Sequence, residues 1–292
     1  MKRQFITGAI AIMAVAAIHS CKKEAEKLPP IGGFNSADEV AATNLVAYLP
    51  LNGSATESKS NTAAANVSGV SWVTGVKGQA AKFDKGYVVF PSTTAYAGLN
   101  SFTISAWVQI KNNGATPSML FQLARDGEWA GTINLMAETG WRKEASDTLP
   151  VKGLIVENRG GNSNWQDCIN KTDAPSDPTD VQKANKVAGA GWFHALVRYD
   201  PTTSQFTAWV NGERISNPTW EVRKFNGSPM GNITLYSPNR IVLGGFYGRI
   251  TGASQDAWQQ NMVGQLDEVR LYSKALTDAE ITALYQLEKA GR

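Results

Sequence analysis

Two adjacent acids, Asp267 and Glu268, are the first candidates for chemistry, because they interrupt a run that alternates like a strand. Neighbouring strand residues point to opposite faces of a sheet, so we do not expect the two carboxylates to act on one substrate atom. Asp267 shares a face with Val269, which predicts that it points inward and needs either N–H donors or a cation. Glu268 shares the other face with Arg270, which predicts a solvent-exposed ion pair.

A second set of candidates is aromatic. Four of the nine tryptophans stand in polar, loop-like contexts: Trp129, Trp141, Trp165 and Trp258. Their flat rings could stack on the faces of sugars, while polar neighbours such as Arg142 and Asn164 bond to the hydroxyl groups. These six residues form the predicted carbohydrate-binding site. The alternative is that the rings fill the bases of long loops.

Residues that would support catalysis are few. We find no strand with two carboxylates at the spacing that places them on one face for retaining glycoside chemistry. Once the N-terminal signal described below is removed, His194 is the only histidine, and we expect it to be a structural residue inside a strand. A serine triad would also need that histidine, and one histidine with one cysteine does not supply a zinc site. We therefore predict no catalytic residue.

Short alternating runs separated by turn residues must position these side chains. The clearest run is 101–110, in which Phe102 and Ile104 share one face. Such alternation predicts strands with one buried face, and its repetition along the chain predicts an all-β sandwich or barrel. Two segments, 139–150 and 159–190, lack the pattern and are expected to be long loops of the kind that carry function.

One helix is predicted near the C-terminus. Thr277 and Glu280 have the spacing of a capping box, and Leu276 and Ile281 are placed for a hydrophobic staple. Ile281 and Leu284 then share a face, so we expect the helix to fold back onto the end of the sandwich.

The first twenty residues are typical of a secretory signal. Lys2 and Arg3 precede an apolar run that is too short and too rich in alanine for a membrane span. Residues 18–21 resemble the lipobox of bacterial lipoproteins, in which the cysteine, here Cys21, is lipidated. Lys22 resembles the residue that follows the cysteine in lipoproteins of the outer membrane. The resemblance implies an outer-membrane lipid anchor, with the protein at the cell surface or on the periplasmic face.

The end of the signal and the end of the segment after it divide the chain into three predicted parts. We expect a signal peptide over 1–20, a flexible tether over 21–42, and one domain over 43–292. The tether is predicted because this segment is charged, then rich in Pro and Gly, and has no apolar period.

The charge balance excludes a nucleic-acid partner. The chain has 28 Lys and Arg and 25 Asp and Glu, and removal of Lys2 and Arg3 with the signal leaves 26 against 25. A chain this close to neutral has no field that attracts nucleic acid or an anionic membrane. Membrane contact is therefore expected through the lipid anchor only. Cys168 is then the one free thiol, so no disulfide is expected.

Several blocks along the chain carry a family resemblance. They are "LVAYLPLNG" (45–53), "GVKGQAAKFDKGYVVFP" (75–91), "SFTISAWV" (101–108), "WFHALVRYD" (192–200) with "WVNGERI" (209–215), and "GQLDEVRLYSKALTDAEI" (264–281). Together they resemble the laminin-G-like form of the concanavalin A-like lectin/glucanase domains, as found in bacterial lipoproteins. The resemblance implies an all-β jelly-roll sandwich of two antiparallel sheets with a short C-terminal helix.

The resemblance also bears on function. It implies a carbohydrate-binding lipoprotein without catalysis, whose partner is a glycan or polysaccharide. The alternatives are a glycoside hydrolase or polysaccharide lyase on the same fold, and an adhesion module of the cell envelope, because this fold hosts all three. By the same resemblance the turn at Asn52 lies near Asp267, so a structural calcium ion held by these two residues is one expectation. An Asp267 held by hydrogen bonds alone is the other.

Overall fold

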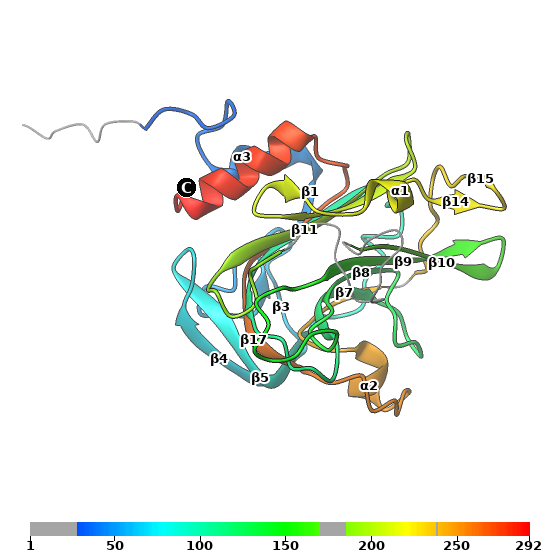
Figure 1. Cartoon of the computed structure of the whole chain (residues 1–292), viewed down its shortest axis with the longest axis horizontal. Helices are drawn as coiled ribbons and strands as arrows, with labels where there is room; N and C mark the ends of the chain where they lie inside the picture. The colour runs from blue at the N-terminus through cyan, green and yellow to red at the C-terminus, as the bar shows by residue number, and fades with distance from the viewer. Residues whose placement is uncertain (1–27, 170–184, 238) are drawn as a thin grey trace, which may run out of the picture.

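The computed structural model describes residues 28–169, 185–237 and 239–292. Thirteen of its strands form one antiparallel sheet that curls over on itself into two layers (Figure 1). The first layer contains, in spatial order, β10 (Asn162–Ile169), β9 (Val151–Arg159), β8 (Ile133–Ala137), β7 (Ser118–Ala124) and β16 (Arg240–Leu243). The long strand β5 (Gln79–Val89) joins this layer to the second.

The second layer holds most of the strands that resemble the family. It contains, after β5, β17 (Met262–Tyr272), β6 (Phe102–Ile110), β11 (Phe193–Asp200), β12 (Gln205–Val210) and β13 (Glu213–Arg214), while β1 (Leu45–Leu49) pairs with β17 and β4 (Asn66–Thr74) pairs with β5. Two hairpins stand apart, β2 (Thr56–Glu57) with β3 (Thr62–Ala63) and β14 (Lys224–Phe225) with β15 (Ser228–Pro229). The helices are η1 (Ala37–Glu39), η2 (Ala42–Asn44), α1 (Pro218–Glu221), α2 (Tyr247–Thr251) and α3 (Asp278–Lys289).

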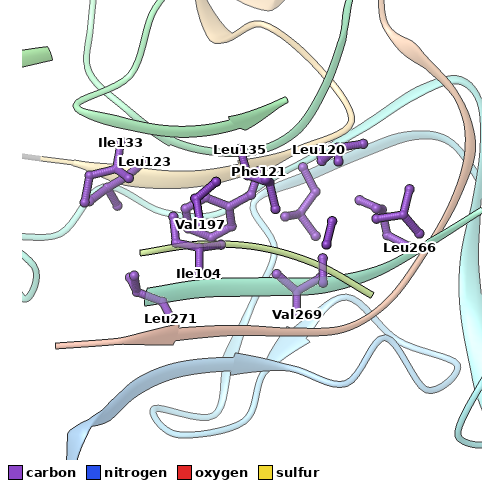
Figure 2. Packing of buried hydrophobic residues seen from close by; sticks show 14 of the residues in the cluster. Ile104, Leu120, Phe121, Leu123, Ile133, Leu135, Val197, Leu266, Val269 and Leu271 are labelled. Atoms are coloured by element: carbon purple, nitrogen blue, oxygen red, sulfur yellow. The ribbon is translucent and has the colours of Figure 1, made fainter. Parts of the chain in front are cut away.

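The core lies between the two layers. Figure 2 shows Ile104, Val197 and Leu271 of the second layer facing Phe121 and Leu135 of the first. These side chains are fully buried and pack in one continuous cluster. Removing this apolar surface from water is the main force that holds the layers together. The jelly-roll sandwich predicted from the sequence is therefore confirmed.

The outer face of the second layer is also covered. The helix α3 begins as predicted, because Thr277 Oγ1 accepts from the N–H of Glu280 (3.2 Å) and Glu280 Oε2 accepts from the N–H of Thr277 (2.7 Å). Its apolar side packs onto the sheet around Trp209 and Tyr272. For this reason both faces of β6 are buried, although its alternation predicted only one.

The ordered domain starts earlier than expected. Ala37 and Val40 are buried against α3, and the N–H of Ala37 donates to the carbonyl of Arg292 (3.2 Å). The boundary predicted after residue 42 is therefore too late, because these two apolar side chains pack against α3. The predicted signal peptide and Cys21 lie outside the described residues. Of the helices in the described ranges, none has the length and apolar character needed to cross a membrane.

The two predicted loops have different outcomes. Residues 139–150 contain no strand in the structure, as expected. The segment 159–190 instead begins with a hairpin, in which β10 pairs with β9 along its whole length. The polar residues of β10 hid this strand, since it lies at the edge of the sheet and its sequence does not alternate between apolar and polar positions. Residues 170–184 of the predicted loop lie outside the described ranges.

A bulge in β17 changes the faces predicted for the two acids. The register with β6 shifts between Asp267 and Arg270, and Glu268 has a φ of +49°. Leu266 and Val269 both belong to the core. The two acids therefore stand together on the outer side of the strand, and the extra bulge residue is the reason that simple alternation failed.

The predicted surface pair of Glu268 and Arg270 is wrong, because both side chains are buried. The Arg270 guanidinium lies 2.7 Å from Glu288 of α3, 3.0 Å from Glu268 and 2.9 Å from Asp38 of η1. Glu288 also accepts from the indole N–H of Trp107 (2.8 Å). This buried charge network fixes α3 to the second layer. It also fixes residues 37–40, which we call the N-terminal segment.

His194 lies beside the same network and is buried, as a structural residue should be. Its Nε2 is 3.5 Å from Glu288. Burial, with a smaller contribution from the Arg270 charge, lowers the pKa of His194 to about 3. The ring is therefore neutral at physiological pH and lies under α3.

Candidate functional site

Three of the four predicted tryptophans meet on the outer face of the first layer. The ring of Trp129 lies 5.5 Å from that of Trp165 and 4.9 Å from that of Trp258, and Phe246 is 5.2 Å from Trp258. We call these four residues the aromatic face. Edge-to-face and offset contacts at such distances are favourable, so the rings hold one another in place.

The aromatic face rests on apolar residues of the underlying strands. Trp129 and Trp258 are half-buried and pack with Met119 and Met136, and Trp129 also covers Leu154 and Val156. Trp129 and Trp258 thus fill space above the strands, as the alternative predicted, and their role in carbohydrate binding stays a prediction. Trp165 is the most open of the three rings, with 42% of its surface exposed.

A buried amide network positions the loop that carries Trp129. The Gln122 amide N–H donates to the carbonyl of Trp129 (2.7 Å), and its Oε1 accepts from the N–H of Tyr247 at the start of α2 (2.9 Å). Asn134 bonds to both the N–H and the carbonyl of Gly131 (2.9 Å each). Because Gln122 and Asn134 also bond to each other (3.1 Å), the loop and α2 are tied to the same strands. The rings are therefore preorganised.

Asn164 does not accompany Trp165. Adjacent residues of β10 point to opposite faces, and the Asn164 amide donates to Glu157 Oε1 (2.7 Å) on the far side. Its amide oxygen accepts from Gln166 (3.0 Å). The Asn164 side chain thus points to the opposite face of the sheet from Trp165, and its predicted position beside that ring is wrong.

Trp141 and Arg142 lie in the 139–150 segment and are half-buried. Among the described residues, no ring contact joins Trp141 to the aromatic face. Their predicted role in carbohydrate binding stays a prediction.

Three charged residues on the same outer face were not predicted. Lys152 of β9 lies 3.6 Å from Glu138, just beyond β8, and 3.8 Å from Asp167 of β10. The sequence search looked for acids on one strand, whereas these come from three neighbouring strands. Once β10 is known to pair with β9, the two-residue period of both strands puts Lys152 and Asp167 on the outer face with Trp165, but the sequence of β10 gave no such signal.

Asp267 is a hydrogen-bonded structural residue. Its Oδ2 accepts from the N–H groups of Val76 (2.7 Å) and Lys77 (3.1 Å), and its Oδ1 accepts from the N–H of Glu268 (2.9 Å). Burial raises the pKa of Asp267 to about 7, although these donors oppose the shift. Asn52 braces the same turn, since its Oδ1 accepts from the N–H of Gln79 (3.0 Å).

The residues around Asp267 do not fit a calcium ion. Calcium takes oxygen ligands, whereas the groups that point at this carboxylate are N–H donors, which carry the wrong partial charge. In the described ranges, no group of three or more His, Cys, Asp or Glu side chains could hold a metal. Of the two expectations for Asp267, the structure supports hydrogen bonds.

A family comparison agrees with the architecture. The model of the concanavalin A-like lectin/glucanases superfamily matches residues 82–282, which is more than half of the chain. The chain belongs to this superfamily. The matched range includes the three tryptophans of the aromatic face. It also includes Glu138, Lys152 and Asp167. No curated protein matches the chain.

Solved structures of the same fold come from diverse proteins. The binding domain of Paraclostridial Mosquitocidal Protein 1 is 16% identical, with a TM-score of 0.53, over 83% of this chain and 52% of that one. The receptor binding domain of botulinum neurotoxin mosaic serotype C/D is 13% identical, with a TM-score of 0.53, over 83% and 50%. Trypanosoma rangeli sialidase, in complex with 2,3-difluorosialic acid, is 16% identical, with a TM-score of 0.51, over 84% and 33%. This superfamily member thus spans a third to about half the length of these neighbours, and the likeness concerns the fold alone.

Proposed function

We propose that this protein is a carbohydrate-binding lipoprotein of the cell envelope that binds a polysaccharide without cleaving it. The aromatic face is the observation that carries the proposal. Its rings are preorganised by the amide network, and Trp165 exposes 42% of its surface. An open, rigid aromatic ring with charged side chains on the same face of the sheet is suited to stacking on a sugar. Membership in a superfamily of lectins and glucanases agrees with this use.

Binding and catalysis are separated by one experiment. The mature chain, purified in detergent, is run in native gels that contain plant, microbial or host polysaccharides. We expect at least one polysaccharide to retard it, because each sugar ring that stacks on the aromatic face adds contact area between the polysaccharide and the protein. We also expect no increase in reducing ends and no unsaturated product, because His194 is buried and we have identified no catalytic residue.

Each alternative has its own result. Release of reducing sugar would favour a glycoside hydrolase, and an unsaturated product would favour a lyase. If no polysaccharide retards the protein, the carbohydrate proposal fails. Capture of an envelope protein through the aromatic face would then favour the adhesion module.

The lipid anchor at Cys21 is part of the same proposal. The N-terminal segment packs on the outer face of the second layer with α3, whereas the aromatic face lies on the outer face of the first. In Figure 1 the helix α3 lies at the top left, and α2, which begins directly after Phe246, lies at the bottom. An anchor that precedes the N-terminal segment would therefore attach the domain on the side of the second layer and leave the aromatic face free to contact a polysaccharide.

Replacing Cys21 with serine is expected to abolish lipidation, because the thiol is the acylated group. Growth of the expressing bacterium with a labelled fatty acid should label the wild-type protein in the outer-membrane fraction and leave the variant unlabelled. Cys168→Ser is the matched control and should keep the label. Equal labelling of wild type and the Cys21 variant would exclude the anchor.

A further inference from the structure

One carboxylate of the outer face is buried beside a lysine. Glu138 is only 5% exposed. Its partner is Lys152, whose Nζ lies 3.6 Å from Glu138 Oε1. Burial raises the pKa of Glu138, and Lys152 only partly offsets this. A carboxylate has about four acceptor sites, so a single lysine leaves sites that a donor from a ligand can fill.

Asp167 places this group beside the aromatic face. It follows Trp165 by two residues on β10, so both side chains stand on the same face with their Cα atoms about 7 Å apart. Asp167 is half-exposed, and Lys152 Nζ links it to Glu138 at 3.8 Å. The edge of a sugar ring stacked on Trp165 would thus lie over a row of three polar groups. Asp167 and Glu138 are the acceptors, and Lys152 between them is the donor.

The charges of this row are already balanced. Lys152 contacts both acids, and Arg223 Nη1 lies 3.6 Å from Asp167 Oδ1. Two cations therefore face two carboxylates. A sugar carboxylate or sulfate would meet two acids without gaining an unpaired cation, whereas the hydroxyl groups of an uncharged sugar can donate to the acids and accept from the lysine.

We propose that Glu138, Lys152 and Asp167 form a polar subsite that binds the hydroxyl groups of an uncharged sugar stacked on Trp165. The inference rests on the proposed function and adds the class of glycan. Glu138 accepts a hydroxyl hydrogen from the sugar, Asp167 accepts a second, and Lys152 Nζ donates to a sugar oxygen. The subsite consequently selects neutral polysaccharides over those that contain uronic acids or sulfate.

The test compares two series of polysaccharides at one ionic strength. The neutral series contains β-glucan, mannan, xylan and arabinan, and the anionic series contains polygalacturonate, alginate and a sulfated galactan. The mature protein and three variants, Glu138→Gln, Lys152→Met and Asp167→Asn, are compared in native affinity gels. Lys186→Met is the matched control, because its exposed pair with Asp147 lies outside the subsite.

We expect the wild type to bind a neutral polysaccharide, and each subsite variant to bind it at least about tenfold more weakly, as the loss of a charge-assisted hydrogen bond implies. The control should bind like the wild type. Asp167 is half-exposed, so its variant stays informative even if Glu138→Gln or Lys152→Met fails to fold.

Two results would overturn the subsite. One is a wild type that binds only the anionic series. The other is unchanged affinity for the neutral ligand in folded Asp167→Asn and in the other folded subsite variants. If the wild type binds neither series, the proposed function itself fails, and this result is distinct from the other two.

Discussion

Replacing Arg270 with methionine is expected to lower the free energy of unfolding by about 3–5 kcal/mol, the usual cost of removing one partner from a buried ion pair. The variant leaves Glu268 and Glu288 buried without their cation. It also releases Asp38 of the N-terminal segment. Urea denaturation followed by far-UV circular dichroism measures the change, and the loss should appear as a lower midpoint.

The matched control is Lys274→Met. Lys274 pairs with Glu280 at 2.7 Å, but its side chain is 38% exposed, so its removal should cost no more than about 1 kcal/mol. Adding Glu288→Gln to the Arg270 variant should recover part of the loss, because it removes one uncompensated charge. Equal midpoints for the Arg270 and Lys274 variants would show that the network does not stabilise the fold as described.

Replacing Trp165 with alanine is expected to weaken polysaccharide binding about fivefold to thirtyfold, because an aromatic residue at the centre of a binding surface commonly contributes about 1–2 kcal/mol. The ring is 42% exposed and contacts Trp129 on one side, so the variant should keep the wild-type melting temperature within a few degrees. Affinity gels and isothermal titration calorimetry with the polysaccharide found in the panel measure the change.

Trp192→Ala serves as the comparison for Trp165. Trp192 is half-buried immediately before β11 in the second layer, away from the aromatic face, and its loss should leave the affinity unchanged. A Trp165 variant that binds as well as the wild type would remove the aromatic face from the binding site. Equal weakening by both substitutions would point instead to a general loss of structure.

Much of the architecture could be predicted because it depends on local pattern. The alternation of 101–110 specifies β6, and Thr277 with Glu280 specifies the start of α3. Each pattern involves only residues close together in the chain, so the element can be predicted without knowing its tertiary contacts. The tryptophans were also identifiable, because bulky rings among polar neighbours are conspicuous in the sequence.

The errors share a physical origin. The bulge at Glu268 inserts one residue, and a shift of one residue reverses every face that simple alternation assigns. The burial of Arg270 depends on α3 and η1, which reach it from 18 residues further along the chain and from the N-terminal segment. The strand β10 was read as a loop because its polar residues pair with β9 at the edge of the sheet.

The sequence by itself determined the types of residue available for binding, most strands of the second layer and the superfamily to which the chain belongs. Only the tertiary structure decided which of them meet. The strand order of the first layer and the loops at its edge bring Trp129, Trp165 and Trp258 together, while the pleat of β10 turns Asn164 to the other face. The same strand order places Lys152 between Glu138 and Asp167. Such contacts join residues far apart in the chain, so they depend on sheet register and loop closure, which no local pattern encodes.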